Sequence, residues 1–169
     1  SHQFTGYTVY GSDNLDLSNI ATAGEFYAAL QLVPENGTIV LQDNITIEDV
    51  GQYGNGTPST YCLVDGITMD LNGHTITVLT NDRFMFAGDD ITVKNGTVQA
   101  GSSSSFSSGY ISYPIAITSG AQDATFEDLV VYGGIEALGN GASLTLNNVT
   151  AEGTNYYAVY LAGGATVTI

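Results

Sequence analysis

The segment ITVKNGTV, residues 91–98, decides the fold because two later segments of the chain repeat its pattern. The later segments are ATFEDLVV at 124–131 and LTLNNVTA at 144–151. Each has alternate apolar residues on both sides of a central Asn or Asp, and such alternation is typical of half-buried β-strands. Asn and Asp tolerate left-handed backbone conformations and bond locally, as a sharp corner requires. Each segment therefore predicts two short strands that meet at a corner.

The first strand of each segment opens on a pair of alternate apolar residues, and similar pairs recur along the chain. The second members of these pairs lie 30, 22, 33, 20 and 23 residues apart. The two long intervals contain the low-complexity tracts GQYGNGTPSTY and AGSSSSFSSGY, which predict loop insertions at about 51–61 and 100–113. Without them the repeat is about 22 residues. The pairs are Ile39/Leu41, Met69/Leu71, Ile91/Val93, Ala124/Phe126, Leu144/Leu146 and Val167/Ile169.

This period, with several short strands and polar corners in each repeat, predicts an all-β solenoid in which stacked coils share one core. The segment LNGH, 71–74, places its Asn one position early, so we expect Asn72 or Gly73 to form that corner. Before residue 37 the pattern is helical, with a capping box at Thr22 and Glu25. We therefore expect an N-terminal segment at 1–36, whose helix at about 22–33 caps the first coil, followed by coils at 37–169.

The order TAGEFYAALQLVPENGTIVLQDNITI, 22–47, followed by GITMDLNGHTITV, 66–78, resembles a known family. It is similar to the start of right-handed parallel β-helix domains of the pectate-lyase-like superfamily, as found in bacterial cell-surface and adhesin-like proteins. The resemblance covers roughly residues 20–169. It implies a single-stranded right-handed parallel β-helix with a short N-terminal capping α-helix, on an extracellular or cell-surface protein. Because the family includes both enzymes and adhesive stalks, the resemblance leaves the activity open.

The charge of the chain excludes several classes of partner. Seventeen acidic residues against two basic ones give a net charge of −15, which repels phosphate backbones and anionic lipid. We expect no nucleic-acid partner and no membrane insertion, since no apolar stretch approaches a span of about 20 residues. The single cysteine, Cys62, supports neither a disulfide framework nor a zinc site. The segment SDNLD, 12–16, lacks the glycine and closing glutamate of a calcium loop, so neither a metal nor a cofactor is expected.

The candidate catalytic groups each have a structural interpretation. Arg83 in NDRF is the one plausible catalytic cation, and a surface ion pair is its alternative role. Asp89 and Asp90 form the best carboxylate pair, yet they lie in an ordinary turn between strands. We interpret His74 as a neighbour of the LNGH corner. No catalytic residue is therefore predicted, although a polysaccharide lyase or glycoside hydrolase in which Arg83 acts with nearby acids remains the alternative.

Tyrosines give the strongest functional signal. The loops that contain them follow the same point in each repeat, which predicts one aromatic edge along the solenoid. Aromatic rings with polar tips in Gly/Ser loops make adaptable contact surfaces for sugars or proteins. The predicted function is a non-catalytic, adhesin-like surface module that binds glycan or a host or partner protein, with a purely structural stalk as a further alternative. The predicted ligand-binding residues are Tyr53, Tyr61, Arg83, Tyr110, Tyr113, Tyr132, Tyr156 and Tyr157.

The last segment, ATVTI at 165–169, begins another coil. A solenoid normally covers the edge of its last coil. We therefore expect either a segment of a longer surface protein or end-to-end self-association through the uncapped C-terminal coil.

Overall fold

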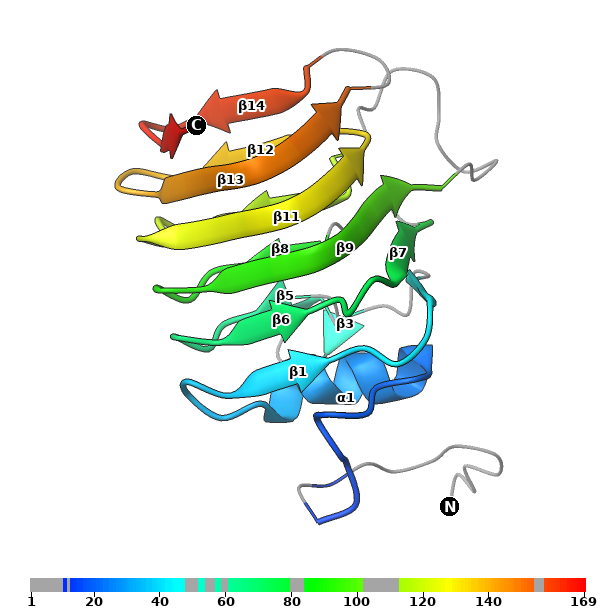
Figure 1. The fold of residues 1–169 in the computed structure, drawn as a ribbon. Helices are drawn as coiled ribbons and strands as arrows, with labels where there is room; N and C mark the ends of the chain where they lie inside the picture. Colours follow the sequence, from blue (N-terminus) through cyan, green and yellow to red (C-terminus); the bar gives the residue numbers. More distant parts are fainter. Residues whose placement is uncertain are drawn as a thin grey trace.

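A computed structural model describes residues 11, 13–47, 61–79, 84–101, 113–153 and 157–169, and the backbone of 52–53 and 57–58. Within these residues the chain is β-sheet apart from one short helix (Figure 1). Most of the predicted loop insertion at about 100–113, and most of that at about 51–61, lies outside the described residues. No helix in the described part of the chain has the length and apolar character needed to cross a membrane.

Helix α1 (Ala23–Leu32) begins where the capping box predicts. The Oγ1 atom of Thr22 accepts a hydrogen bond from the Glu25 N–H at 3.2 Å, and the Glu25 carboxylate accepts one from the Ala21 N–H at 3.4 Å. The apolar face of the helix, which includes Phe26 and Leu30, is buried. Strand β1 (Thr38–Val40) lies next to this helix, which covers that end of the molecule (Figure 1).

Eight parallel strands form the larger sheet. Strands β2 (Ile45–Ile47) and β7 (Thr75–Val78) pair with each other, and β7 also pairs with β9. The main order is β1, β6 (Thr68–Asp70), β9 (Thr92–Ala100), β11 (Ala124–Tyr132), β13 (Ser143–Glu152) and β15 (Thr166–Thr168).

A second parallel sheet contains five strands, and the chain visits the two sheets in turn. Its order is β14 (Val159–Ala162), β12 (Ile135–Leu138), β10 (Ile115–Ile117), β8 (Phe84–Phe86) and β5 (Tyr61–Cys62). Strands β3 (Gln52–Tyr53) and β4 (Thr57–Pro58) form a separate antiparallel pair. The parallel stacking of successive repeats is compatible with the predicted solenoid. The strands β5, β8, β10, β12 and β14 nevertheless form a sheet that is separate from the larger one.

The predicted corners are confirmed. Asn95, Asp128 and Asn148 have φ values of 60°, 50° and 51°, in the left-handed region, and each lies in the middle of a long strand of the larger sheet. The side chains also connect successive repeats: the Asn148 Nδ2 donates to the Asp128 Oδ1 at 2.6 Å, and the Asn95 Nδ2 donates to the Asp70 Oδ1 at 3.2 Å. Such side-chain ladders stabilise the stacking as well as the turn.

The predicted alignment of one repeat was wrong by two residues. The apolar pairs align Leu71 with Val93, but in the sheet Met69 pairs with Val93, a separation of 24 residues. Beyond the corner, Ile76 pairs with Val98, a separation of 22. The difference arises because the LNGH corner has two more residues than the corner at 95–96. Asn72 and Gly73 both have positive φ, so both form this wider corner.

The core lies between the two sheets and continues beneath α1. Alternate residues of β8, β10 and β12 belong to it, as do Phe126 of β11 and Phe26 of the helix. The Phe26 and Phe84 rings meet edge to face, with their centroids 5.4 Å apart. This contact joins α1 to the second sheet.

Candidate functional site

The outer face of the second sheet has a row of side chains that the register places side by side. In the parallel pairings, Tyr61 is opposite Met85, Met85 opposite Ala116, Ala116 opposite Glu136, and Glu136 opposite Tyr160. Their neighbours along β5, β8, β10 and β12 belong to the core, so alternation directs this row to the other face. The row has a tyrosine at each end.

Three tyrosine rings stack at the β14 end of this row. The ring centroids of Tyr113 and Tyr160 are 5.6 Å apart, with an angle of 22° between the ring planes. Those of Tyr157 and Tyr160 are 6.1 Å apart, with an angle of 21°. Both distances lie in the range of favourable aromatic pairs. Tyr113, Tyr160 and Tyr157 are 3%, 37% and 56% exposed, so the stack runs from a buried ring to an open one.

A glycine holds the buried end of the stack. A Cβ atom at Gly134 would lie 2.9 Å from the Tyr113 ring carbon Cδ1 and 2.6 Å from the Tyr157 carbonyl oxygen. Gly134 also has a φ of 112°, a conformation that side chains disfavour. Only glycine therefore lets Tyr113 and the backbone of Tyr157 approach this closely.

Glu136 provides a carboxylate beside the stack. Its side chain is 4% exposed, and it is the one buried charged residue in the described part of the chain. Alternation directs it away from the core, and its register neighbour on one side is Tyr160. A buried carboxylate on an outer face is costly and is retained only with compensating interactions. The stack and Glu136 therefore place aromatic rings next to a buried carboxylate.

Of the predicted ligand-binding residues, four have described side chains, and the structure places them at three different locations. Tyr113 and Tyr157 meet in the stack, whereas Tyr61 lies at the opposite end of the row, where its hydroxyl hydrogen-bonds the Ser119 Oγ at 2.9 Å. Tyr132 ends β11 in the larger sheet, and its side chain is 43% exposed. Only the backbone of Tyr53 is described. Arg83, Tyr110 and Tyr156 lie outside the described residues.

The turn and corner candidates have structural partners. The Asp89 carboxylate accepts a hydrogen bond from the Gln122 N–H at 2.8 Å, and Asp90 has a φ of 55°, as expected for an inter-strand turn. The backbone of His74 closes the LNGH corner, since its N–H donates to the Leu71 carbonyl at 2.7 Å. These contacts agree with the structural interpretation of both segments.

The described part of the segment SDNLD and the residues after it contain turns at 13–14 and 17–18. Hydrogen bonds from the side chain and backbone of Ser18 hold the pKa of the Asp16 carboxyl below its ordinary value. Among the described residues, no group of three or more His, Cys, Asp or Glu side chains is placed to hold a metal ion.

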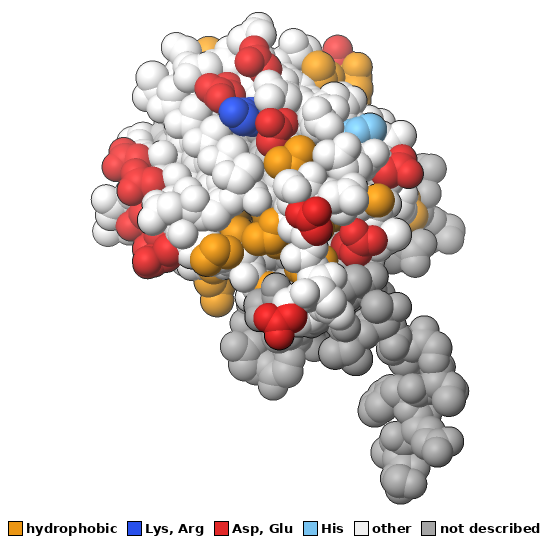
Figure 2. All heavy atoms as spheres, turned by 60° about the horizontal axis from the view of Figure 1, so that its bottom comes forward, with side chains coloured by type: hydrophobic (Ala, Val, Ile, Leu, Met, Phe, Trp, Pro, Cys, Tyr) orange, Lys and Arg blue, Asp and Glu red, His pale blue; other side chains and the backbone are white. Residues whose placement is uncertain are grey.

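On the face that Figure 2 shows, the acidic side chains lie in several separate groups. Lys94 is flanked in register by Asp70 and Glu127 on the larger sheet. This arrangement places Lys94 away from the tyrosine stack, which belongs to the other sheet.

The sequence alone did not identify two residues of the stack region as candidate site residues. Tyr160 and Glu136 belong to strands VYLA and IEAL, which show the period of two but have no Asn or Asp corner to fix their alignment. Pairing Ile135 with Val159 would have placed Glu136 beside Tyr160.

Comparison with protein-family models, curated protein sequences and solved structures finds no match to this chain.

Proposed function

We propose that this chain is a right-handed parallel β-helix module of an extracellular or cell-surface protein, and that it binds neutral glycans without cleaving them. One observation carries the binding proposal: the Tyr113, Tyr160 and Tyr157 rings form a stack that grades from buried to exposed. Such a stack is pre-ordered, so a ligand need not immobilise the rings when it binds.

The β-helix part of the proposal is supported by the alternation of the chain between two parallel sheets. Connections between parallel strands are almost always right-handed. The surface location is supported by the resemblance of residues 20–169 to adhesin-like β-helices.

Sugar binding fits the chemistry of the stack. The C–H face of a pyranose packs against an aromatic ring, while phenolic hydroxyls donate and accept hydrogen bonds with sugar hydroxyls. Tyr157 and Tyr160 present both features at the surface. A net charge of −15 disfavours acidic polysaccharides, so a neutral glycan is the ligand that the electrostatics favour.

A binding role is favoured over hydrolysis by the number of carboxylates in the row. Most glycoside hydrolases use two carboxyl groups on opposite sides of the scissile bond. In the row from Tyr61 to Tyr160, Glu136 is the one acidic residue. We therefore assign Glu136 a hydrogen-bonding role beside Tyr160.

An oligosaccharide array of neutral and acidic glycans tests the proposal, followed by calorimetry with the best neutral ligand. We expect Tyr157→Ala and Tyr160→Ala each to weaken binding about tenfold, equivalent to about 1.4 kcal/mol. Leu63→Ala is the matched control, because Leu63 is 56% exposed, as Tyr157 is, and follows β5 at the far side of the same sheet.

Circular dichroism of each variant establishes that the fold is retained. Failure of every neutral glycan to bind would contradict the proposal and favour a structural stalk. Unchanged binding by the double tyrosine variant would remove the stack as the site. Release of reducing or unsaturated ends from any polysaccharide would show that the module is an enzyme.

A further inference from the structure

The turn that joins β12 to β13, residues 139–142, has the local geometry of a type II β-turn. The Ala142 N–H donates to the Gly139 carbonyl at 3.1 Å. Asn140, the second residue of the turn, has a negative φ, and Gly141, the third, has a φ of 87°. A type II turn requires glycine or asparagine at that third position. The turn projects from the side of the molecule (Figure 1), and Asn140 and Gly141 are both exposed.

An asparagine followed by glycine is chemically reactive in water. The backbone nitrogen of the glycine attacks the asparagine Cγ atom and a C–N bond forms. The side-chain nitrogen leaves as ammonia and takes the proton that the attacking nitrogen loses. Water then opens the resulting succinimide at either carbonyl, which yields aspartate or isoaspartate. Glycine favours the attack because it has no side chain beside its nitrogen and its backbone bends freely. The reaction therefore needs water, a free glycine N–H and a free asparagine side chain.

Two of the four Asn-Gly pairs in the described residues have their glycine N–H groups bound. The Gly37 N–H donates to the Pro34 carbonyl at 2.9 Å, and the Gly73 N–H donates to the Asn95 carbonyl at 2.7 Å. A nitrogen that donates such a bond must release it before it can attack the neighbouring side chain. These hydrogen bonds therefore slow the reaction at both pairs in the folded chain.

The third pair, Asn95 and Gly96, lies inside β9 and is held by packing as well as by hydrogen bonding. The Asn95 Nδ2 donates to the Asp70 Oδ1 at 3.2 Å. A Cβ atom at Gly96 would lie 2.6 Å from the His74 carbonyl oxygen, so this part of the backbone is closely packed. The backbone of a central strand cannot bend toward Cγ without breaking its pairing with both neighbours.

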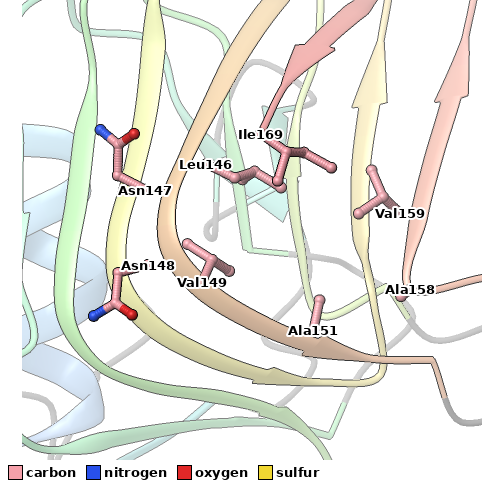
Figure 3. Close-up of a pocket in the computed structure, with 8 residues that line it drawn as sticks. All are labelled: Leu146, Asn147, Asn148, Val149, Ala151, Ala158, Val159 and Ile169. Atoms are coloured by element: carbon pink, nitrogen blue, oxygen red, sulfur yellow. The ribbon is translucent and has the colours of Figure 1, made fainter.

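Exposure alone does not select a reactive asparagine, as Asn148 shows. Its side chain is exposed and lies on the opposite side of β13 from those of Leu146 and Val149 (Figure 3). The Asn148 Nδ2 is nevertheless bound to the Asp128 Oδ1 at 2.6 Å. The following residue, Val149, is β-branched and stiff, so it shields its own backbone nitrogen.

The fourth pair, Asn140 and Gly141, has none of these restraints. In the part of the chain that the structure describes, no hydrogen bond holds the Asn140 side chain or the Gly141 N–H. A Cβ atom at Gly141 would meet no atom within 4 Å, so this side of the turn is open. The other side is packed, because a Cβ atom at Gly120 would lie 2.8 Å from the Asn140 carbonyl oxygen.

We propose that Asn140 is a modification site of this chain, where Asn140 and Gly141 form a succinimide that hydrolyses to aspartate or isoaspartate. The other three described pairs stay intact in the folded chain. Either product adds one negative charge to the turn. Isoaspartate also inserts a methylene group into backbone that packs closely against the preceding turn at Gly120. The reaction is independent of glycan binding, because it needs neither a ligand nor the tyrosine stack.

Peptide mapping by mass spectrometry tests the proposal. The folded chain and the chain in guanidinium are incubated in parallel in mildly alkaline buffer, and both products are quantified with time at each Asn-Gly pair. In guanidinium the pairs should react at similar rates, because they share the same dipeptide. In the folded chain Asn140 should react at least roughly tenfold faster than Asn36, Asn72 or Asn95, since their hydrogen bonds must open first. A fifth pair, at 55–56, lies outside the described residues and is quantified separately.

Two variants provide a matched comparison by isoelectric focusing of the folded chain. Asn140→Gln should form the acidic product more slowly than the unmodified chain, because glutamine must close a larger ring. Asn147→Gln, at an exposed asparagine that is followed by Asn148, should form it at the unmodified rate. Equal rates for the two variants would overturn the proposal. So would a folded chain in which Asn140 reacts no faster than Asn72, or in which folding slows both residues by the same factor.

Discussion

Substitution of Asp128 tests whether the polar corners stabilise the stacked repeats. Asp128 has a φ of 50°, and its Oδ1 accepts a hydrogen bond from the Asn148 Nδ2 at 2.6 Å. In Asp128→Ala the left-handed conformation costs about 1 kcal/mol. The lost hydrogen bond is exposed, so its loss costs about 0.5–1 kcal/mol. The free energy of unfolding should therefore fall by about 1.5–2 kcal/mol.

Two companion variants separate these effects. Asp128→Gly removes the hydrogen bond but adopts positive φ without strain, so it should lose only about 0.5–1 kcal/mol. Asp128→Asn retains both the acceptor and the tolerance of positive φ, so its stability should match that of the unmodified chain. Urea unfolding, monitored by circular dichroism, measures the free energy of unfolding of the three Asp128 variants. We expect the slope m to be the same for all of them. If Asp128→Gly were less stable than Asp128→Ala, the corner argument would be refuted.

Two further outcomes follow from the packing of single residues. In Gly134→Ala the new methyl group meets the Tyr113 ring and the Tyr157 carbonyl, so the free energy of unfolding should fall by about 1–3 kcal/mol. Glycan affinity should fall as well, because the same contacts position the stack. Undiminished affinity would show that the stack does not form the site. Burial raises the pKa of the Cys62 thiol, so at neutral pH the thiol stays protonated and out of reach. A thiol reagent should react with the native chain at least roughly a thousandfold more slowly than with the chain in guanidinium, in proportion to the free energy of opening; equal rates would contradict a buried Cys62.

Local signals in the sequence predicted much of the fold. The corners at Asn95, Asp128 and Asn148 were predictable because Asn or Asp at a fixed distance from an apolar pair favours a left-handed turn. The cap of α1 was predictable for the same reason, since Thr22 and Glu25 are three residues apart. The pairing of Met69 with Val93 was not, because the length of a corner changes the register without changing the apolar pattern.

The candidate site was harder to predict because it depends on contacts between repeats. Tyr113 and Tyr157 were recognised as loop aromatics, but their common neighbour Tyr160 comes from a strand. The connections that precede β10, β12 and β14 differ in length, at 14, 2 and 6 residues, so sequence spacing does not align these strands. Glu136 was missed because one acidic residue in an alternating strand is ordinarily a solvated position, and its burial follows only from the three-dimensional packing.

The central claim is that the exposed rings of the tyrosine stack contact a neutral glycan. Nuclear magnetic resonance of the chain with isotope-labelled tyrosine rings, titrated with the neutral oligosaccharide selected on the array, tests it most directly. We expect shifts of the Tyr157 and Tyr160 ring signals and nuclear Overhauser contacts from their ring protons to sugar C–H protons, with the Tyr27 ring of α1 unaffected. Saturating ligand that leaves the Tyr157 and Tyr160 signals unmoved, or that makes its contacts at other rings, would contradict it.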